Sequence, residues 1–145
     1  MSAKPIPEGY RTVTPYLNIQ GAAELIKFLQ QAFDAGLKER IDGPDGTIVH
    51  AEVRIGDSIV MLSDPHGDCP QTPGSFYLYV ADADATYRRA LEAGATSVME
   101  PANQFWGDRQ GGVRDRFGNL WWIATRIEEV SGEELQRRMA ALAAR

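Results

Sequence analysis

His50 and Glu52 stand two residues apart in TIVHAEVRI, residues 47–55, so a strand would turn both side chains to one face. There the imidazole could act as a general base oriented by the carboxylate, because histidine titrates near neutral pH. The same pair could hold a metal ion only with a further ligand, and two candidates without a third fall short of a metal site. We therefore expect His50 to hydrogen-bond to a neighbouring carboxylate or to a bound ligand.

A second stretch with chemical potential is FWGDRQGGVRDRFGNLWWIATR, residues 105–126. Its adjacent tryptophans must point to opposite faces of a strand, and we expect Trp121 to enter the core while Trp122 faces a cleft. Three charged residues are interpreted as parts of a salt-bridged strand and turn rather than as catalytic groups: Asp108, Asp115 and Arg116.

The composition limits the classes of partner. A chain of 145 residues with 43% hydrophobic residues fits one domain with its own core. Its net charge of −5 argues against nucleic acid, because lysine and arginine dominate contacts with phosphates. No apolar run reaches the length of a membrane span, and the single cysteine excludes an internal disulfide. We expect a cytoplasmic protein with no nucleic-acid or membrane partner; the acidity favours a neutral or cationic small ligand, or serves only solubility.

The elements that must position these residues occur twice. Residues 13–19 have the pattern of a strand and 22–33 that of an amphipathic helix, followed by strands near 37–41, 47–55 and 58–63. After a linker at 65–74, which holds His66 as an expected surface residue, the order repeats. A strand at 75–80 precedes a helix capped by Asp82 or Asp84, and strands follow near 96–99, 111–114 and 120–125.

Three matches support a duplication, with offsets of 61 for Tyr16 and Tyr77 (77 − 16), 60 for Val53 and Val113 (113 − 53), and 62 for Gly56 and Gly118 (118 − 56). The prediction is a single α+β domain of two tandem β-α-β-β-β units, at residues 12–64 and 75–127. A C-terminal helix at 130–145 follows, marked by a capping box, and its narrow apolar stripe predicts docking on this chain or on a partner subunit.

Together with this duplication, the opening TPYL, the block VHAEVRIGDSIVMLSD and the ending FWGDRQGGVRDRFGNLWWIAT resemble the vicinal oxygen chelate superfamily. That superfamily includes glyoxalase I, bleomycin-resistance proteins and extradiol dioxygenases, and the best match within it is the PhnB-like branch. The resemblance covers about residues 12–127 and implies a glyoxalase/bleomycin resistance fold, in which each unit curls into a half-barrel whose concave sheet lines a ligand cleft. It also implies a homodimer, as in most small relatives.

Strand alternation then selects the cleft residues. Val13, Leu17 and Ile19 should face the helix of the first unit, as should Val49, Ala51, Val53 and Ile55. Alternation also assigns Thr14, Arg54, Ser75, Gln110 and Ala124 to the cleft, and Phe105 could join from its loop. The expected ligand-binding residues are Tyr16, Asn18, His50, Tyr77, Tyr79, Trp106, Arg114 and Trp122, and the catalytic candidates are His50 and Glu52.

The resemblance also implies where a metal would bind: at the first strand of each unit and just after each glycine turn. Those places hold Thr14, Ser75, Val60 and Trp122, none of which is a good ligand for a divalent metal. We therefore expect no cofactor, with a divalent metal disfavoured. The expected function is binding of a small aromatic or cationic molecule in an aromatic-lined cleft. Two alternatives remain open: a metal-dependent lyase, isomerase or dioxygenase, and a metal-free enzyme that uses His50 as base.

Overall fold

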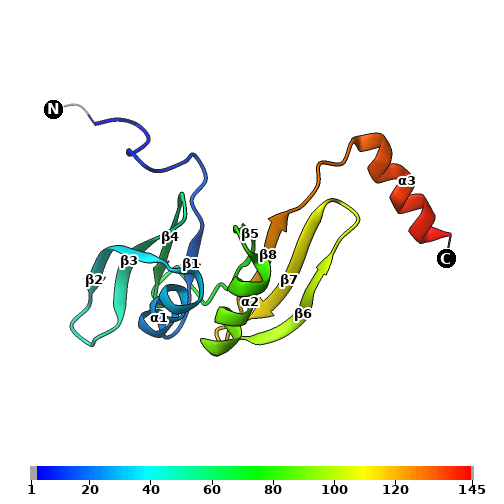
Figure 1. The fold of residues 1–145 in the computed structure, drawn as a ribbon. Helices are drawn as coiled ribbons and strands as arrows, with labels where there is room; N and C mark the ends of the chain where they lie inside the picture. Colours follow the sequence, from blue (N-terminus) through cyan, green and yellow to red (C-terminus); the bar gives the residue numbers. More distant parts are fainter. Residues whose placement is uncertain (1–2, 145) are drawn as a thin grey trace.

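The computed structural model describes residues 3–144 and confirms the tandem fold (Figure 1). The first unit contains β1 (Tyr16–Asn18), α1 (Ala22–Phe33), β2 (Gly36–Asp42), β3 (Ile48–Ile55) and β4 (Ser58–Ser63). The second unit contains β5 (Ser75–Tyr79), α2 (Ala83–Glu92), β6 (Thr96–Asn103), β7 (Asp108–Arg114) and β8 (Leu120–Arg126), and α3 (Gly132–Ala143) follows it.

Both units have the same sheet topology. The strand orders are β1-β4-β3-β2 and β5-β8-β7-β6, and in each sheet the first strand runs parallel to the last one of its unit. Such a parallel pair needs a crossover connection, which the helix provides. The register is also equivalent, because Tyr16 lies opposite Met61 and Tyr77 lies opposite Trp122. Corresponding positions in the two units can therefore be compared directly.

Side chains cap the N-terminal ends of the three helices. Asp64, just after β4, accepts hydrogen bonds from the backbone N–H groups of Gly21 (2.8 Å) and Ala22 (3.3 Å) at the start of α1. Asp82 caps α2 by accepting from the Ala85 N–H at 3.1 Å. Ser131 caps α3 through the Glu134 N–H at 3.2 Å. Each acceptor satisfies a backbone donor that the first turn of a helix leaves unpaired.

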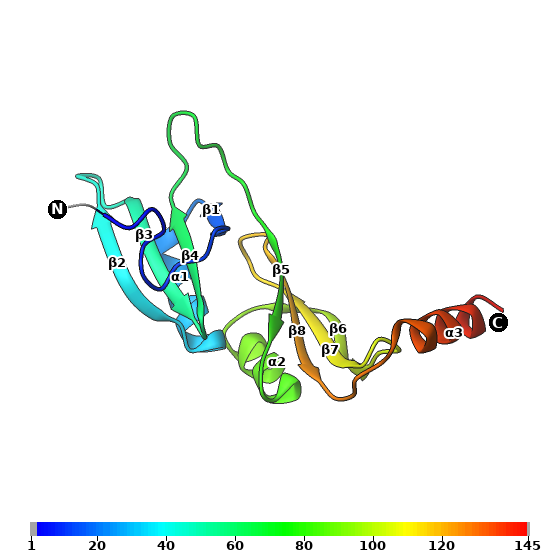
Figure 2. The same ribbon diagram turned by 90° about the horizontal axis from the view of Figure 1, so that it is seen from above.

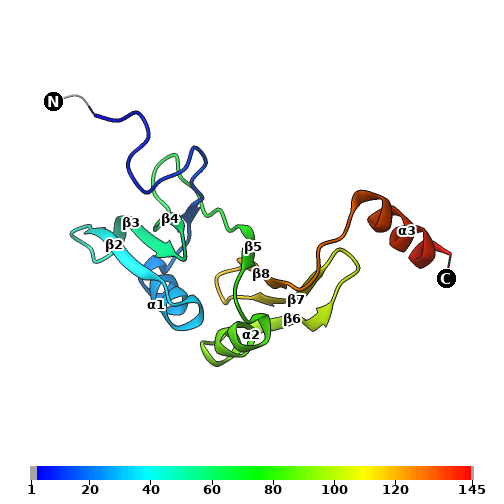
Figure 3. The ribbon, with the colours of Figure 1, turned by 45° about the horizontal axis from the view of Figure 1, so that its top comes forward.

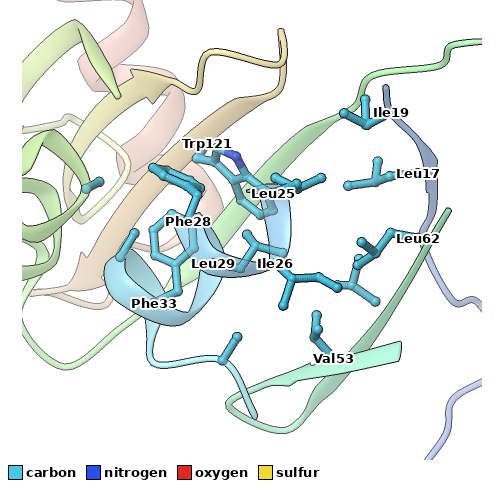
Figure 4. Close-up of a cluster of buried hydrophobic side chains, with 14 of the residues drawn as sticks. Leu17, Ile19, Leu25, Ile26, Phe28, Leu29, Phe33, Val53, Leu62 and Trp121 are labelled. Atoms are coloured by element: carbon cyan, nitrogen blue, oxygen red, sulfur yellow. The ribbon is translucent and has the colours of Figure 1, made fainter. Parts of the chain in front are cut away.

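One hydrophobic core joins the two units. The helices α1 and α2 pack side by side between the two sheets (Figures 1 and 2). Trp121 of β8 is buried against this layer, stacked on Phe76 with ring centroids 4.5 Å apart and tilted against Phe33 at 5.0 Å (Figure 4). This confirms Trp121 as a core residue, and it ties the second sheet to the helix of the first unit.

Two residues that alternation placed against the helix are exposed instead. Val13 is 81% exposed because it precedes β1, which begins only at Tyr16. Val49 is 47% exposed because a bulge interrupts the pairing of β2 with β3: Ile41 pairs with His50, but the next residue, Asp42, pairs with Ile48. A bulge adds one residue to a strand and breaks its strict alternation. Those two predictions were therefore wrong.

The helix α3 lies apart from both sheets (Figure 3). Its apolar side chains Met139 and Leu142 are 54% and 44% exposed, so the stripe does not dock on the described part of this chain. Arg138 connects the helix to the second unit by donating to the Phe105 backbone oxygen (2.9 Å) and to Glu128 (2.7 Å). Within residues 3–144, no helix combines the length and hydrophobicity of a membrane span.

Candidate functional site

The concave face of the first unit carries a chain of polar contacts. Nε2 of His50 lies 2.8 Å from Oε2 of Glu52, so the two residues do share one strand face. The Tyr16 ring stands edge-on to the imidazole, with centroids 6.0 Å apart, and its hydroxyl lies 3.3 Å from Oγ of Ser63. That serine in turn donates to Oδ1 of Asn18 at 2.9 Å.

The N-terminal strap, residues 3–14, covers this face. The hydroxyl group of Tyr10 donates to Glu52, and Nζ of Lys38 donates to the Tyr10 oxygen at 2.8 Å. Burial alone would raise the pKa of Glu52, but the hydrogen bonds from Tyr10 and His50 outweigh it and lower the pKa. Glu52 is therefore a buried carboxylate that stays ionised at neutral pH.

The concave face of the second unit is organised around another carboxylate. Asp108 is fully buried, and its oxygens accept hydrogen bonds from four side chains: Tyr77 (2.6 Å), Tyr79 (3.0 Å), Trp106 (3.1 Å) and Arg126 (2.7 Å). The Tyr77 and Tyr79 rings lie 5.4 Å apart and are 41% and 59% exposed. The polar ends of these residues thus point inward, while their rings face outward.

The same network shifts the acidity of its members. Burial raises the pKa of the Asp108 carboxyl group. The hydrogen bonds that it accepts, led by the one from Tyr77, outweigh burial and lower the pKa. Burial and the bond to Asp108 raise the pKa of Tyr77 to about 12. Hydrogen bonds to Tyr79 and Asp108 raise the pKa of Arg126. At neutral pH the centre is therefore an ion pair of Asp108 and Arg126, with the neutral phenol of Tyr77 bonded to the carboxylate.

Trp122 lies on this face beside Tyr77, and its indole covers Gly112. A Cβ atom at Gly112 would lie 2.5 Å from the indole ring, which is far closer than two carbon atoms can approach. The glycine therefore leaves the space that the ring occupies. We call Tyr77, Tyr79, Trp106 and Trp122 the aromatic shelf.

The structure separates the predicted ligand-binding residues into two groups. Tyr16, Asn18, His50 and Glu52 belong to one sheet and the aromatic shelf to the other, and no hydrogen bond or aromatic pair joins them within residues 3–144. Arg114 is exposed, and among the described residues its side chain donates only to the Gly118 backbone oxygen, at 3.5 Å. Between the units lies an open cavity of about 1000 Å³, whose aromatic lining residues are Phe33, Phe76, Tyr77, Tyr79 and Trp121.

Comparison with known proteins places this geometry in a family. The family model of the Glyoxalase/Bleomycin resistance protein/Dioxygenase superfamily matches residues 12–123. The chain belongs to this superfamily. An uncharacterized protein of Mycobacterium bovis is 40% identical over 143 residues, covering 89% of this chain and 92% of that protein.

Solved structures agree with that assignment. The crystal structure of TioX from Micromonospora sp. ML1 is similar with a TM-score of 0.65 and 26% identity, covering 83% of this chain and 100% of TioX. The PhnB protein from Bacillus cereus has a TM-score of 0.64 and 19% identity, covering 79% of this chain and 99% of that one, which shows a shared fold.

The positions at which metal-dependent members of the superfamily hold their ligands do not suit a metal here. The register corrects one of them: Met61, and not Val60, lies opposite Tyr16 as Trp122 lies opposite Tyr77, while Val60 is buried beside Val53 in the core. The set is then Thr14, Met61, Ser75 and Trp122. Divalent metals in such sites take imidazole or carboxylate, so this donor set does not fit one.

Three residues of these faces were missed from the sequence: Tyr10, Lys38 and Arg126. Tyr10 precedes the periodic segments, and Lys38 reaches the concave face from a bulge between Leu37 and Glu39. Asp108 was expected in a salt-bridged strand, and it does pair, but with Arg126, whereas its neighbour Arg109 binds Asp84 at 2.6 Å. For Asp115 the structural role is confirmed, since it accepts from the N–H groups of Phe117 and Asn119, both at 2.9 Å.

Proposed function

We propose that this chain binds a planar aromatic or cationic organic molecule and sequesters it, with the aromatic shelf as the binding surface. The observation that carries the proposal is the position of Asp108. By accepting from the polar ends of Tyr77, Tyr79 and Trp106, it holds their rings in fixed positions while two of them stay exposed. A surface fixed before binding loses little side-chain entropy when a ligand arrives.

The chemistry of the shelf favours flat or positively charged ligands. Aromatic rings attract one another in stacked or edge-on pairs, and a cation over a ring gains about 0.5–2 kcal/mol, depending on how far it is desolvated. The guanidinium of Arg126 already lies 5.9 Å from the centroid of Tyr79, so one face of the shelf accommodates a cation. The cavity of about 1000 Å³ beside Tyr77 and Tyr79 adds room for a drug-sized molecule.

We further propose that the protein works as a homodimer. The polar face of the first unit and the aromatic shelf are separate within one chain, and a second copy could place one against the other. Light scattering at micromolar concentration should give twice the mass of 16.0 kDa. A monomer at that concentration would contradict the dimer without affecting the shelf.

The binding proposal is tested with a planar aromatic cation and a variant of the aromatic shelf. Proflavine, a planar aromatic cation, should bind the wild-type protein and raise its melting temperature, because a ligand of the native state stabilises it by mass action. Trp122→Ala should weaken this binding by about 1–3 kcal/mol through the loss of a ring contact. Tyr87→Phe, which changes a tyrosine on α2 away from the shelf, is the control and should bind as the wild type does. Equal affinity of wild type and Trp122→Ala would contradict the proposal.

A second candidate function is metal-free catalysis at the first unit, favoured by the contact between His50 and Glu52. An ionised carboxylate 2.8 Å from the imidazole would orient it as a general base. If this function holds, His50→Ala should abolish turnover of a candidate substrate while its binding is retained. Loss of binding alone would instead assign His50 to ligand contact.

A further inference from the structure

The N-terminal strap is joined to the sheet by a single side chain. Within residues 3–14, the hydrogen bonds that reach the concave face of the first unit all involve the Tyr10 phenol. The other polar contacts of these residues are local, such as Lys4 with Glu8 at 3.6 Å and the Tyr10 N–H with the Pro7 oxygen at 3.1 Å. Most strap residues are exposed, so little hydrophobic burial holds the segment down.

The phenol occupies a position with a specific hydrogen-bonding character. Its oxygen donates to the buried carboxylate of Glu52 and accepts from Lys38 at 2.8 Å, and the Lys38 ammonium also lies 4.8 Å from the ring centroid. A group placed here must therefore donate one hydrogen bond, accept another and carry a ring. A phenol meets all three conditions, whereas an ammonium group cannot accept from lysine and would be repelled by it.

The space around the phenol suits a small ligand. A cavity of about 390 Å³ lies between the strap and the sheet, which is within the ordinary range for ligand pockets. The strap lines it with Ile6, Tyr10 and Thr12, and the sheet lines it with Lys38, Glu52 and Met61. The site is therefore half built by a segment that one side chain holds in place.

We propose that Tyr10 is an internal occupant of a second binding site, and that the ligand of this site is a phenolic aromatic molecule that displaces Tyr10 from Glu52. The inference rests on the proposed function only for the aromatic class of ligand. The second site lies on the first unit, whereas the aromatic shelf lies on the second unit. The proposal also names the chemical group by which the ligand is recognised. The strap then acts as a competitor, since binding requires the closed form to open.

The test uses p-cresol, toluene and benzylamine, which present a phenol, a bare ring and an ammonium group. The chain has two histidines, His50 on this face and His66 in the linker between the units. The imidazole NMR signals of His50 therefore report binding at this face and not at the aromatic shelf. Tyr10→Phe removes the competing hydroxyl and should bind p-cresol about 10-fold more tightly than the wild type, because a closed form that dominates at equilibrium lowers apparent affinity by at least that factor. In Tyr10→Phe, toluene and benzylamine should bind at least about 10-fold more weakly than p-cresol, because neither can both donate to Glu52 and accept from Lys38.

Strap opening is measured separately by trypsin cleavage after Arg11. Tyr10→Phe should speed this cleavage without any ligand, and p-cresol should speed it in the wild type, since both release the segment. Tyr87→Phe removes a hydroxyl bonded to Ser97 instead and should change neither readout. In the Tyr10→Phe background, Glu52→Gln should return p-cresol affinity to the wild-type value.

Three outcomes would overturn the proposal: unchanged cleavage in Tyr10→Phe, unchanged or slower cleavage of the wild type with p-cresol, or equal affinity of Tyr10→Phe for p-cresol and toluene. Failure of the shelf proposal looks different, because it appears with proflavine and Trp122→Ala while the His50 signals and the cleavage after Arg11 are unaffected.

Discussion

The two units use equivalent central positions of their concave faces in opposite ways. In the first unit Glu52 pairs with Met61, and the carboxylate collects hydrogen bonds from Tyr10 and His50. In the second unit Gly112 pairs with Trp122, and the absent side chain leaves room for the indole. One backbone thus supports a charged face and an aromatic face, so the two positions, and not the fold, set the chemistry of each unit.

The helix-facing sides of the same sheets differ less. Val60 and Trp121 both precede the central pair by one residue, and both are buried. The indole of Trp121 is larger than the Val60 side chain, and it contacts Phe33 of α1 in the other unit. The second unit therefore contributes its ring to a core that both units share, which makes Trp121 the residue whose loss should have the largest effect.

Trp121→Ala should lower the free energy of unfolding by about 3–5 kcal/mol, the usual cost of truncating a buried tryptophan. The indole also donates a hydrogen bond to Asp115 at 2.8 Å, which the variant leaves without its donor. Urea denaturation gives the value. Trp122→Ala is the matched control, and because that ring is half-buried it should cost clearly less; equal losses would contradict the assignment of the two faces.

Gly112→Ala should destabilise the protein by about 1–3 kcal/mol, the typical cost of overpacking, and should displace the Trp122 ring. A Cβ at this position would lie 2.5 Å from the indole. Gly36→Ala is the control, since a Cβ there meets nothing within 4 Å. Denaturation gives the energy and near-ultraviolet circular dichroism gives the ring environment. A stable variant with an unchanged spectrum would show that the ring does not rest on the glycine.

Tyr77 of the aromatic shelf should make the stability of the protein depend on pH in alkaline solution. The folded-state pKa of Tyr77 is about 12, above the unfolded value of 10.0, so its neutral form is favoured by folding. The resulting stability is fully present below pH 10 and is lost as the pH rises toward 12. Tyr77→Phe should therefore show a smaller fall in stability over this interval than the wild type. An equal fall in Tyr77→Phe and in the wild type would contradict a raised pKa of Tyr77 in the folded protein.

The smallest expected effect is that of restoring a carboxylate on the aromatic shelf. Trp122→Glu should not create tight zinc or nickel binding, because Thr14, Met61 and Ser75 still offer no imidazole or carboxylate. Isothermal titration calorimetry of the variant and the wild type makes the comparison. Tight binding only in Trp122→Glu would contradict the conclusion that this donor set does not fit a metal.

The fold could be predicted because its evidence is spread along the whole chain. The apolar periodicity of residues 22–33 predicted α1, and near-equal offsets between the units predicted the duplication. Neither observation depends on the exact end of a strand. The placement of Trp121 in the core and Trp122 on the concave face followed from alternation within one short, regular strand.

Where alternation is interrupted, prediction from the sequence failed. The bulge opposite Ile41 exposed Val49, and the chain from Gly56 to the central pair is one residue longer than that from Gly118, which moved the equivalent position from Val60 to Met61. Tyr10 could not be found because residues 3–15 have no periodicity that predicts which surface they cover. The partner of Asp108 comes from a different strand, and local charge patterns do not encode that contact.

The contact between Trp122 and Gly112 also makes the aromatic shelf sensitive to a residue that is not part of it. The indole occupies the space of a Cβ atom at position 112, so any side chain there must move the ring. Gly112 belongs to β7, whereas Trp122 belongs to β8. A substitution on β7 therefore changes the shape of the aromatic shelf without altering any of its four residues.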